Sequence, residues 1–156
     1  MNILLGLFLI FMPLLIMPGV RELWWEDAPP PLSYGTPVAA INWLAQHETL
    51  PGKMWSDIHL ASYQIYALPS RPVWIDTRIQ VVYPPAMFDE YFAIATASSV
   101  WGELLEEYDI NLLLLSTVSE PRLVTALEET PEWCRLYEDG TALVYARNQG
   151  DEGCPQ

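Results

Sequence analysis

The chain begins with a long apolar run, because residues 3–20 contain no charged side chain. That length is at the lower limit for a helix that crosses the ~30 Å hydrocarbon core of a bilayer. Pro13 and Pro18 are tolerated in membrane helices, whereas prolines inside a soluble helix usually break it. We therefore predict a transmembrane anchor over residues 1–20.

Two other interpretations of this run remain open, a cleaved signal peptide and a buried soluble helix. A signal peptide has a basic start and a small-x-small cleavage site, and the sequence has neither. Arg21, Trp24 and Trp25 follow the run at the place where a membrane span has its interfacial residues. We predict that these three residues lie at the membrane interface and that membrane lipid is a partner.

After a proline-rich spacer over residues 21–35, apolar positions change between the helical and the strand period. Helical periodicity, often preceded by a capping residue or proline, is found over residues 37–47, 58–68, 85–98, 100–109 and 121–130. Short apolar runs typical of strands cover residues 53–57, 72–76 and 110–116. The end of the chain has two strand patterns, residues 132–138 and 141–147, around Asp139-Gly140.

This order of elements predicts an α/β domain over residues 36–147. We expect a three-layer domain with a mostly parallel central sheet. The pair Asp139-Gly140 is a typical two-residue hairpin turn, so a C-terminal β-hairpin is expected as an antiparallel addition. Residues 148–156 are polar and are predicted to form a flexible tail.

The charge balance excludes one class of function. The chain has 7 Lys and Arg against 20 Asp and Glu, a net charge of −13. Nucleic-acid binding requires a basic surface that replaces counterions of the phosphates, so we predict no nucleic-acid partner. With 51% hydrophobic residues, the chain also lacks the low hydrophobicity of disordered acidic proteins.

Four polar residues are candidates for a binding site. Asp76 and Arg78 end the predicted strand 72–76, and Asp57 and His59 lie at the preceding strand–helix corner. Ligand groups of α/β folds lie at the carboxyl ends of strands, which supports polar contacts to a sugar or a lipid head group. The structural alternative is an ion pair or an Asx turn at Asp76 and a helix N-cap at Asp57. We favour this alternative because no glycine-rich phosphate loop is nearby.

No catalytic residue, metal site or cofactor is predicted. The sequence has no G-x-S-x-G elbow and no C-x-x-C motif, and its histidines, His47 and His59, lack metal-ligand spacing. Cys134 and Cys154 are the only cysteines. They form either a disulfide, as is common outside the cytoplasm, or two unrelated thiols, since the sequence does not give their separation.

Several segments together resemble a known type of domain: PVAAINWLAQ, YQIYALPSRPVWIDTR, YFAIATASSVWGELLEEYDINLLLL and YEDGTALVYAR. The chain resembles the extracytoplasmic C-terminal domain, with its preceding membrane helix, of bacterial multi-pass membrane proteins that are glycosyltransferase-like or uncharacterised. The resemblance implies the α/β fold and an extracytoplasmic (periplasmic) position, although Arg21 alone slightly favours the cytoplasmic side. It implies no activity, because this sequence lacks the acidic loop from which catalysis is expected in those proteins.

These observations predict a non-catalytic, single-span accessory subunit in the cell membrane. Its partners would be other subunits of a larger bacterial membrane complex, such as the electron-transfer complex called alternative complex III. The alternative is a domain that binds a sugar or a lipid-linked acceptor beside a membrane glycosyltransferase. In that alternative Asp57, His59, Asp76 and Arg78 supply the polar contacts.

Overall fold

The computed structural model describes residues 2–16, 32–50, 52–148 and 153–155. The chain divides into two compact units, Met1–Tyr34 and Gly35–Gln156. The predicted spacer lies almost entirely outside the described residues, and so do the predicted interface residues Arg21, Trp24 and Trp25.

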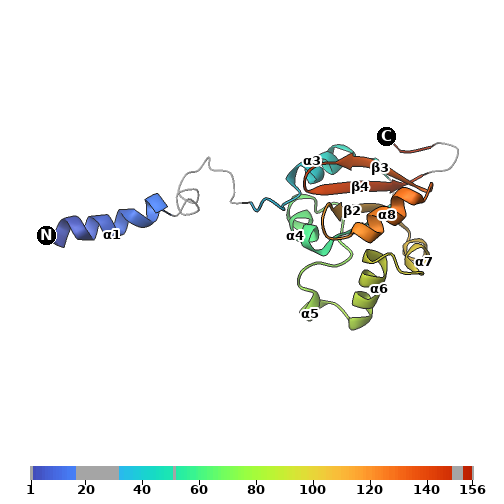
Figure 1. Ribbon diagram of the computed structural model, residues 1–156, viewed down its shortest axis with the longest axis horizontal. Coiled ribbons are helices and arrows are strands. Elements are labelled where there is room, and N and C mark those ends of the chain that lie inside the picture. The colour runs from blue at the N-terminus through green and yellow to red at the C-terminus, as the bar shows by residue number, and fades with distance from the viewer. Residues whose placement is uncertain (1, 17–31, 51, 149–152, 156) are drawn as a thin grey trace. The chain divides into compact units, whose positions relative to one another are not determined.

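The first unit contains helix α1 (Asn2–Ile16; Figure 1). This helix has no acidic residue in its first turn and no basic residue in its last. This helix covers most of the apolar run, and residues 17–20 of the predicted anchor lie outside the described residues. Among the helices that the structure describes, none combines the length and the hydropathy needed to cross a bilayer.

The second unit is an α/β domain, as predicted. Its helices are α3 (Val38–Gln46), α4 (Ile58–Ala67), α5 (Ile79–Val82), α6 (Pro85–Ala95), α7 (Trp101–Glu107) and α8 (Pro121–Glu129). Its strands are β1 (Lys53–Ser56), β2 (Ile110–Ser116), β3 (Trp133–Glu138) and β4 (Ala142–Arg147).

The four strands form one mixed sheet in the order β1-β2-β4-β3. Only β1 and β2 are parallel, while β2 pairs with β4 and β4 with β3 in antiparallel fashion. The expectation of a mostly parallel sheet is therefore wrong. The C-terminal hairpin supplies half of the strands, and its buried strand β4 takes a central place instead of an edge.

The predicted strand over residues 72–76 is also wrong, because these residues form a loop. Pro72 has no N–H group for a sheet ladder, which disfavours this segment as a strand. Ile75 is nevertheless fully buried in the core. An apolar run thus predicted burial correctly but not the strand pairing, since a loop that packs against the core has the same composition.

Helices cover both faces of the sheet, so the three-layer arrangement is found (Figure 1). One core includes Ile41 of α3 and Leu60 of α4, packed with alternate residues of β2 and β4. The other core includes side chains of α6, α7 and α8. The two cores together bury the central strands β2 and β4 from both sides.

The C-terminal hairpin has its turn one residue later than predicted. Asp139 N–H donates to the Ala142 carbonyl at 3.0 Å, so Gly140 and Thr141 are the central turn residues. Asp139 Oδ1 accepts hydrogen bonds from the N–H groups of Thr141 and Ala142, at 2.6 and 2.8 Å, and stabilises this turn as an Asx-type cap.

Cys134 and Cys154 form a disulfide with a Cα separation of 5.8 Å. Of the two interpretations left open by the sequence, the structure therefore supports the disulfide. The bond connects the tail to β3 at Cys154, within the segment that the sequence predicts to be flexible.

Candidate functional site

The carboxyl ends of the parallel strands bring two acidic residues together. Asp57 directly follows β1, and Glu120 lies between β2 and α8, where it is the N-cap residue of that helix. Because β1 and β2 are adjacent and parallel, their carboxyl ends share one edge of the sheet. Asp57 is fully buried and Glu120 is 5% exposed.

Asp57 has the capping role that the sequence predicts. Its Oδ1 accepts a hydrogen bond from the His59 N–H at 2.6 Å, in the first turn of α4. Its own N–H donates to the Leu114 carbonyl at 2.8 Å and continues the ladder between the parallel strands. An N-capping carboxylate also interacts favourably with the positive end of the helix dipole.

Tyr91 of α6 completes a group that we call the strand-end cluster, Asp57, Tyr91 and Glu120. The Tyr91 hydroxyl oxygen accepts a hydrogen bond from the Ile58 N–H at 3.0 Å. Trp55 stacks on the Tyr91 ring with 4.9 Å between centroids. The cluster thus connects the end of β1, the start of α8 and the middle of α6.

A raised pKa of Glu120 explains how two acidic groups are buried together. Asp57 Oδ2 and Glu120 Oε2 are both buried, and no N–H or O–H group in the described part of the chain donates to either. Burial, and then the negative charge of Asp57, raises the pKa of Glu120 from 4.5 to about 9. At neutral pH Glu120 is therefore a carboxylic acid, which can donate its proton to the Asp57 carboxylate.

Asp76 and Arg78 form the ion pair that the sequence analysis favours. The Asp76 side chain is 1% exposed and accepts bonds from the Arg78 N–H at 2.8 Å and from the Arg78 guanidinium at 2.6 Å. The Tyr83 hydroxyl donates to it at 2.9 Å. These hydrogen bonds, mainly those from Arg78, hold the pKa of Asp76 well below its usual range.

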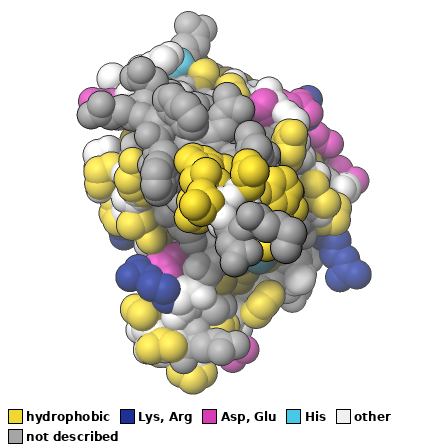
Figure 2. Space-filling model, turned by 90° about the vertical axis from the view of Figure 1, so that its left-hand side faces the viewer, with side chains coloured by type: hydrophobic (Ala, Val, Ile, Leu, Met, Phe, Trp, Pro, Cys, Tyr) yellow, Lys and Arg dark blue, Asp and Glu magenta, His cyan; other side chains and the backbone are white. Residues whose placement is uncertain are grey.

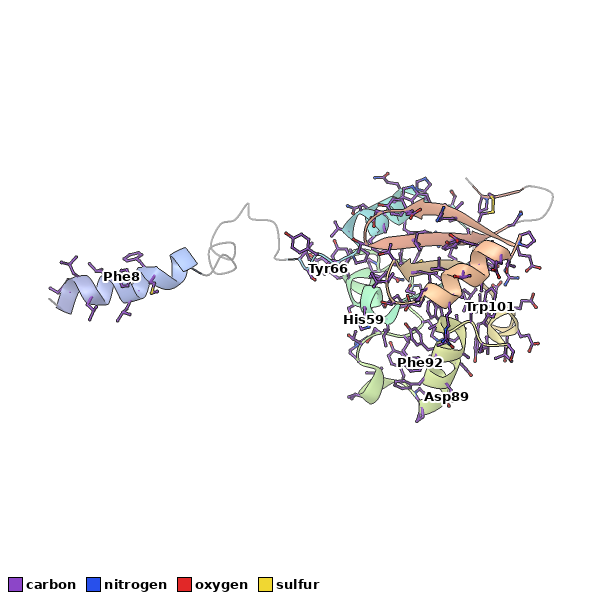
Figure 3. All side chains as sticks on the ribbon, in the orientation of Figure 1. Phe8, His59, Tyr66, Asp89, Phe92 and Trp101 are labelled. Carbon is purple, nitrogen blue, oxygen red and sulfur yellow. A yellow bond between two sulfur atoms is a disulfide. The ribbon has the colours of Figure 1, made fainter. Side chains whose placement is uncertain are left out.

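The four predicted binding residues do not converge as one group. Among the described residues, no hydrogen bond or ion pair joins Asp57 to either Asp76 or Arg78. His59 lies exposed on α4, and Asp57 contacts it through the backbone N–H (Figure 3). The nearest connection is a 2.9 Å hydrogen bond between the hydroxyls of Ser62 and Thr77.

Sequence reasoning missed Glu120 and Tyr91. Glu120 could have been found, because it follows the strand 110–116 and precedes the helix-initiating Pro121, as Asp57 follows the strand 53–56. Tyr91 gives no such signal, since it is one of several aromatic residues in its helix. Within the part of the chain that the structure describes, no cluster of three or more potential metal-ligating side chains is present.

No protein-family model matches this chain, and comparison with characterised proteins gives no significant match.

Proposed function

We propose that this chain is a membrane-anchored, non-catalytic accessory subunit whose α/β domain docks to a larger membrane complex outside the cytoplasm. The apolar surface of α1 is the observation that carries this proposal. Ile3 is 82% exposed, and Leu4 and Phe8 are exposed as well (Figure 3). A bilayer provides the apolar environment that such a helix needs.

The disulfide supports the extracytoplasmic side. Disulfides persist in oxidising compartments and are rare in the cytosol. Cys134 lies in β3 and is 7% exposed, so its bond to Cys154 is part of the folded domain. The resemblance to extracytoplasmic domains of bacterial membrane proteins favours the same side.

Exposed apolar side chains on the domain support docking. Val81 of α5 is 90% exposed, and Val82 and Phe92 are each about half exposed. Apolar side chains are visible at the surface beside acidic and basic ones (Figure 2). Contiguous apolar surface often marks a contact with another protein, and a membrane-embedded partner is the class that the anchor makes available.

The test is extraction of the native membrane with mild detergent, followed by size separation and mass spectrometry. We expect the chain to migrate with a large complex at fixed stoichiometry. Leu9→Arg places a charge in the apolar helix and should release the chain from the membrane fraction, because a buried charge is costly in a bilayer. Val118→Arg is the matched control, since Val118 is 81% exposed on the domain.

Two results would contradict this proposal. Migration of the wild-type chain alone in a single detergent micelle would exclude a stable complex. Equal membrane retention of the Leu9→Arg and Val118→Arg chains would show that α1 does not anchor the protein.

A second candidate is the binding of a sugar or a lipid-linked acceptor, supported by the hydrogen bond between Ser62 and Thr77. Ser62 lies one helical turn after His59, and Thr77 precedes Arg78, whose side chain is 62% exposed. The His59 imidazole and the Arg78 guanidinium thus belong to two segments, α4 and the turn before α5, that this hydrogen bond connects. His59→Ala should abolish sugar binding in ligand-observed NMR and leave the fold intact, because the Asp57 cap uses only the backbone of His59. Binding that survives this substitution would exclude His59 as a contact.

A further inference from the structure

A cavity of about 460 Å³ lies at the amino end of β1, remote along that strand from the strand-end cluster. The loop that precedes β1 and the loop over residues 70–74 form its walls. We call it the Arg71 cavity, and its lining includes Glu48, Lys53, Met54, Arg71, Val73 and Trp74. Its volume is within the range of small-molecule sites in proteins, about 300–1,000 Å³.

The Arg71 cavity is basic in a strongly acidic protein. The whole chain has a net charge of −13 and a single lysine, Lys53, which lines this cavity together with Arg71. Glu48 is the one acidic lining residue, so the lining has one more positive than negative charge. In the part of the chain that the structure describes, no ion pair occupies the Lys53 ammonium.

The Arg71 guanidinium is held in place by its surroundings. Its Nη2 donates to the carbonyls of His47, Glu48 and Leu50, at 3.3, 3.2 and 3.0 Å. The buried Gln64 side chain donates to the Arg71 carbonyl at 2.9 Å. Within the described residues these bonds use only Nη2, so the N–H groups of Nε and Nη1 remain as single donors for an anionic group.

The opposite wall is apolar and rigid. Met54 is buried in β1, and Trp74 packs edge-on against Tyr108 with 4.2 Å between ring centroids. Gly52 also lies close to the backbone-proximal part of Asn111, since it has a φ of +88° and a Cβ there would lie 2.6 Å from Asn111 Cβ. Rigid walls reduce the ordering cost of binding.

We propose that the Arg71 cavity binds a small ligand in which a carboxylate or phosphate group is joined to an apolar body. The anionic group pairs with the Lys53 ammonium and accepts a hydrogen bond from one of the remaining N–H groups of Arg71. The apolar body lies against Met54, Val73 and Trp74. This inference does not depend on the docking function, since a docking subunit and a free domain would have the same cavity.

The experiment uses the full chain in mild detergent with fluorinated tryptophan, and follows the ¹⁹F resonance of Trp74, assigned with the Trp74→Phe chain. The probes are phenyl phosphate, benzoate, inorganic phosphate and the neutral benzyl alcohol. We expect the two aromatic anions to shift this resonance at lower concentration than the other two probes. The stronger of the two identifies the anionic group as phosphate or carboxylate.

Lys53→Gln removes one cavity charge, and Arg122→Gln is the control, because Arg122 is exposed and does not line this cavity. We expect Lys53→Gln to weaken binding of the aromatic anions about tenfold and Arg122→Gln to leave it unchanged. Equal weakening in both variants would show a general charge effect and overturn the proposal. The absence of any shift of the Trp74 resonance, or an equal response to benzyl alcohol, would overturn it as well.

Discussion

Charged side chains are found at both ends of β1, in opposite environments. After its carboxyl end, Asp57 is buried near Glu120, whose pKa is raised. At its amino end, Lys53 and Arg71 line an open cavity. The usual rule for α/β folds would place a ligand at the carboxyl end. For the ligand site that we propose, the position in the fold is therefore a weaker guide than two other features. These are the solvent access of the charged groups and whether they are already paired within the protein.

The largest predicted effect concerns the pH dependence of stability at the closed end. The pKa of Glu120 is about 9 in the folded domain and 4.5 as an ordinary glutamate. The folded state therefore holds a proton that the unfolded state has lost, so this contribution to stability is complete below about pH 4.5. It is lost as the pH rises through about 9, on the order of 1 kcal/mol per pH unit.

Glu120→Gln should remove this pH dependence. An amide can donate to Asp57 at every pH, so the variant should be more stable than the wild type in alkaline solution, by several kcal/mol near pH 9 on the same linkage argument. Urea unfolding of both full-length chains in mild detergent, from pH 5 to pH 9, measures the difference. Parallel pH profiles would contradict the raised pKa of Glu120.

A smaller effect is expected from Asp57→Ala. This change removes the N-cap of α4 and leaves the buried Glu120 carboxyl without its acceptor, with a combined cost of about 2–4 kcal/mol in the free energy of unfolding. Asp57→Asn keeps an acceptor for the His59 N–H and should recover part of the loss. Equal unfolding midpoints for the wild-type and alanine chains would show that the cluster does not stabilise the domain.

The smallest effect is expected at the open end. Lys53→Gln should change the free energy of unfolding by no more than about 0.5 kcal/mol, because exposed side chains without ion pairs contribute little. The measurement is the same urea series at neutral pH. A loss as large as that of Asp57→Ala would show that Lys53 has a structural role and would remove the contrast between the two ends.

The sequence predicted the positions of helices and strands better than the pairing of strands in the sheet. The helix that starts after Asp57, the strand 110–116 and the Pro121 start of α8 all depend on neighbouring residues, and the structure confirms them. The sheet order depends on which strand packs beside β2, and short-range periodicity does not contain that information. The burial of Ile75 was therefore predictable, whereas its loop conformation was not.

The same difference between local sequence features and long-range packing explains which parts of the candidate sites could be predicted. Asp76 and Arg78 are two residues apart, so their ion pair could be predicted from the sequence. The strand-end cluster combines residues 57, 91 and 120, and the raised pKa of Glu120 results from a burial that no single segment determines. The Arg71 cavity likewise forms only where two separate loops meet.

The Cys134–Cys154 disulfide has a mechanical consequence. The covalent ring that it closes contains all of β4, since this strand lies between the two cysteines in the chain. Tension applied to the chain beyond Cys154 is transmitted through the sulfur bridge directly to β3. Strand β4 then carries no load. As long as the disulfide is oxidised, the sheet resists unfolding that starts from its C-terminal end.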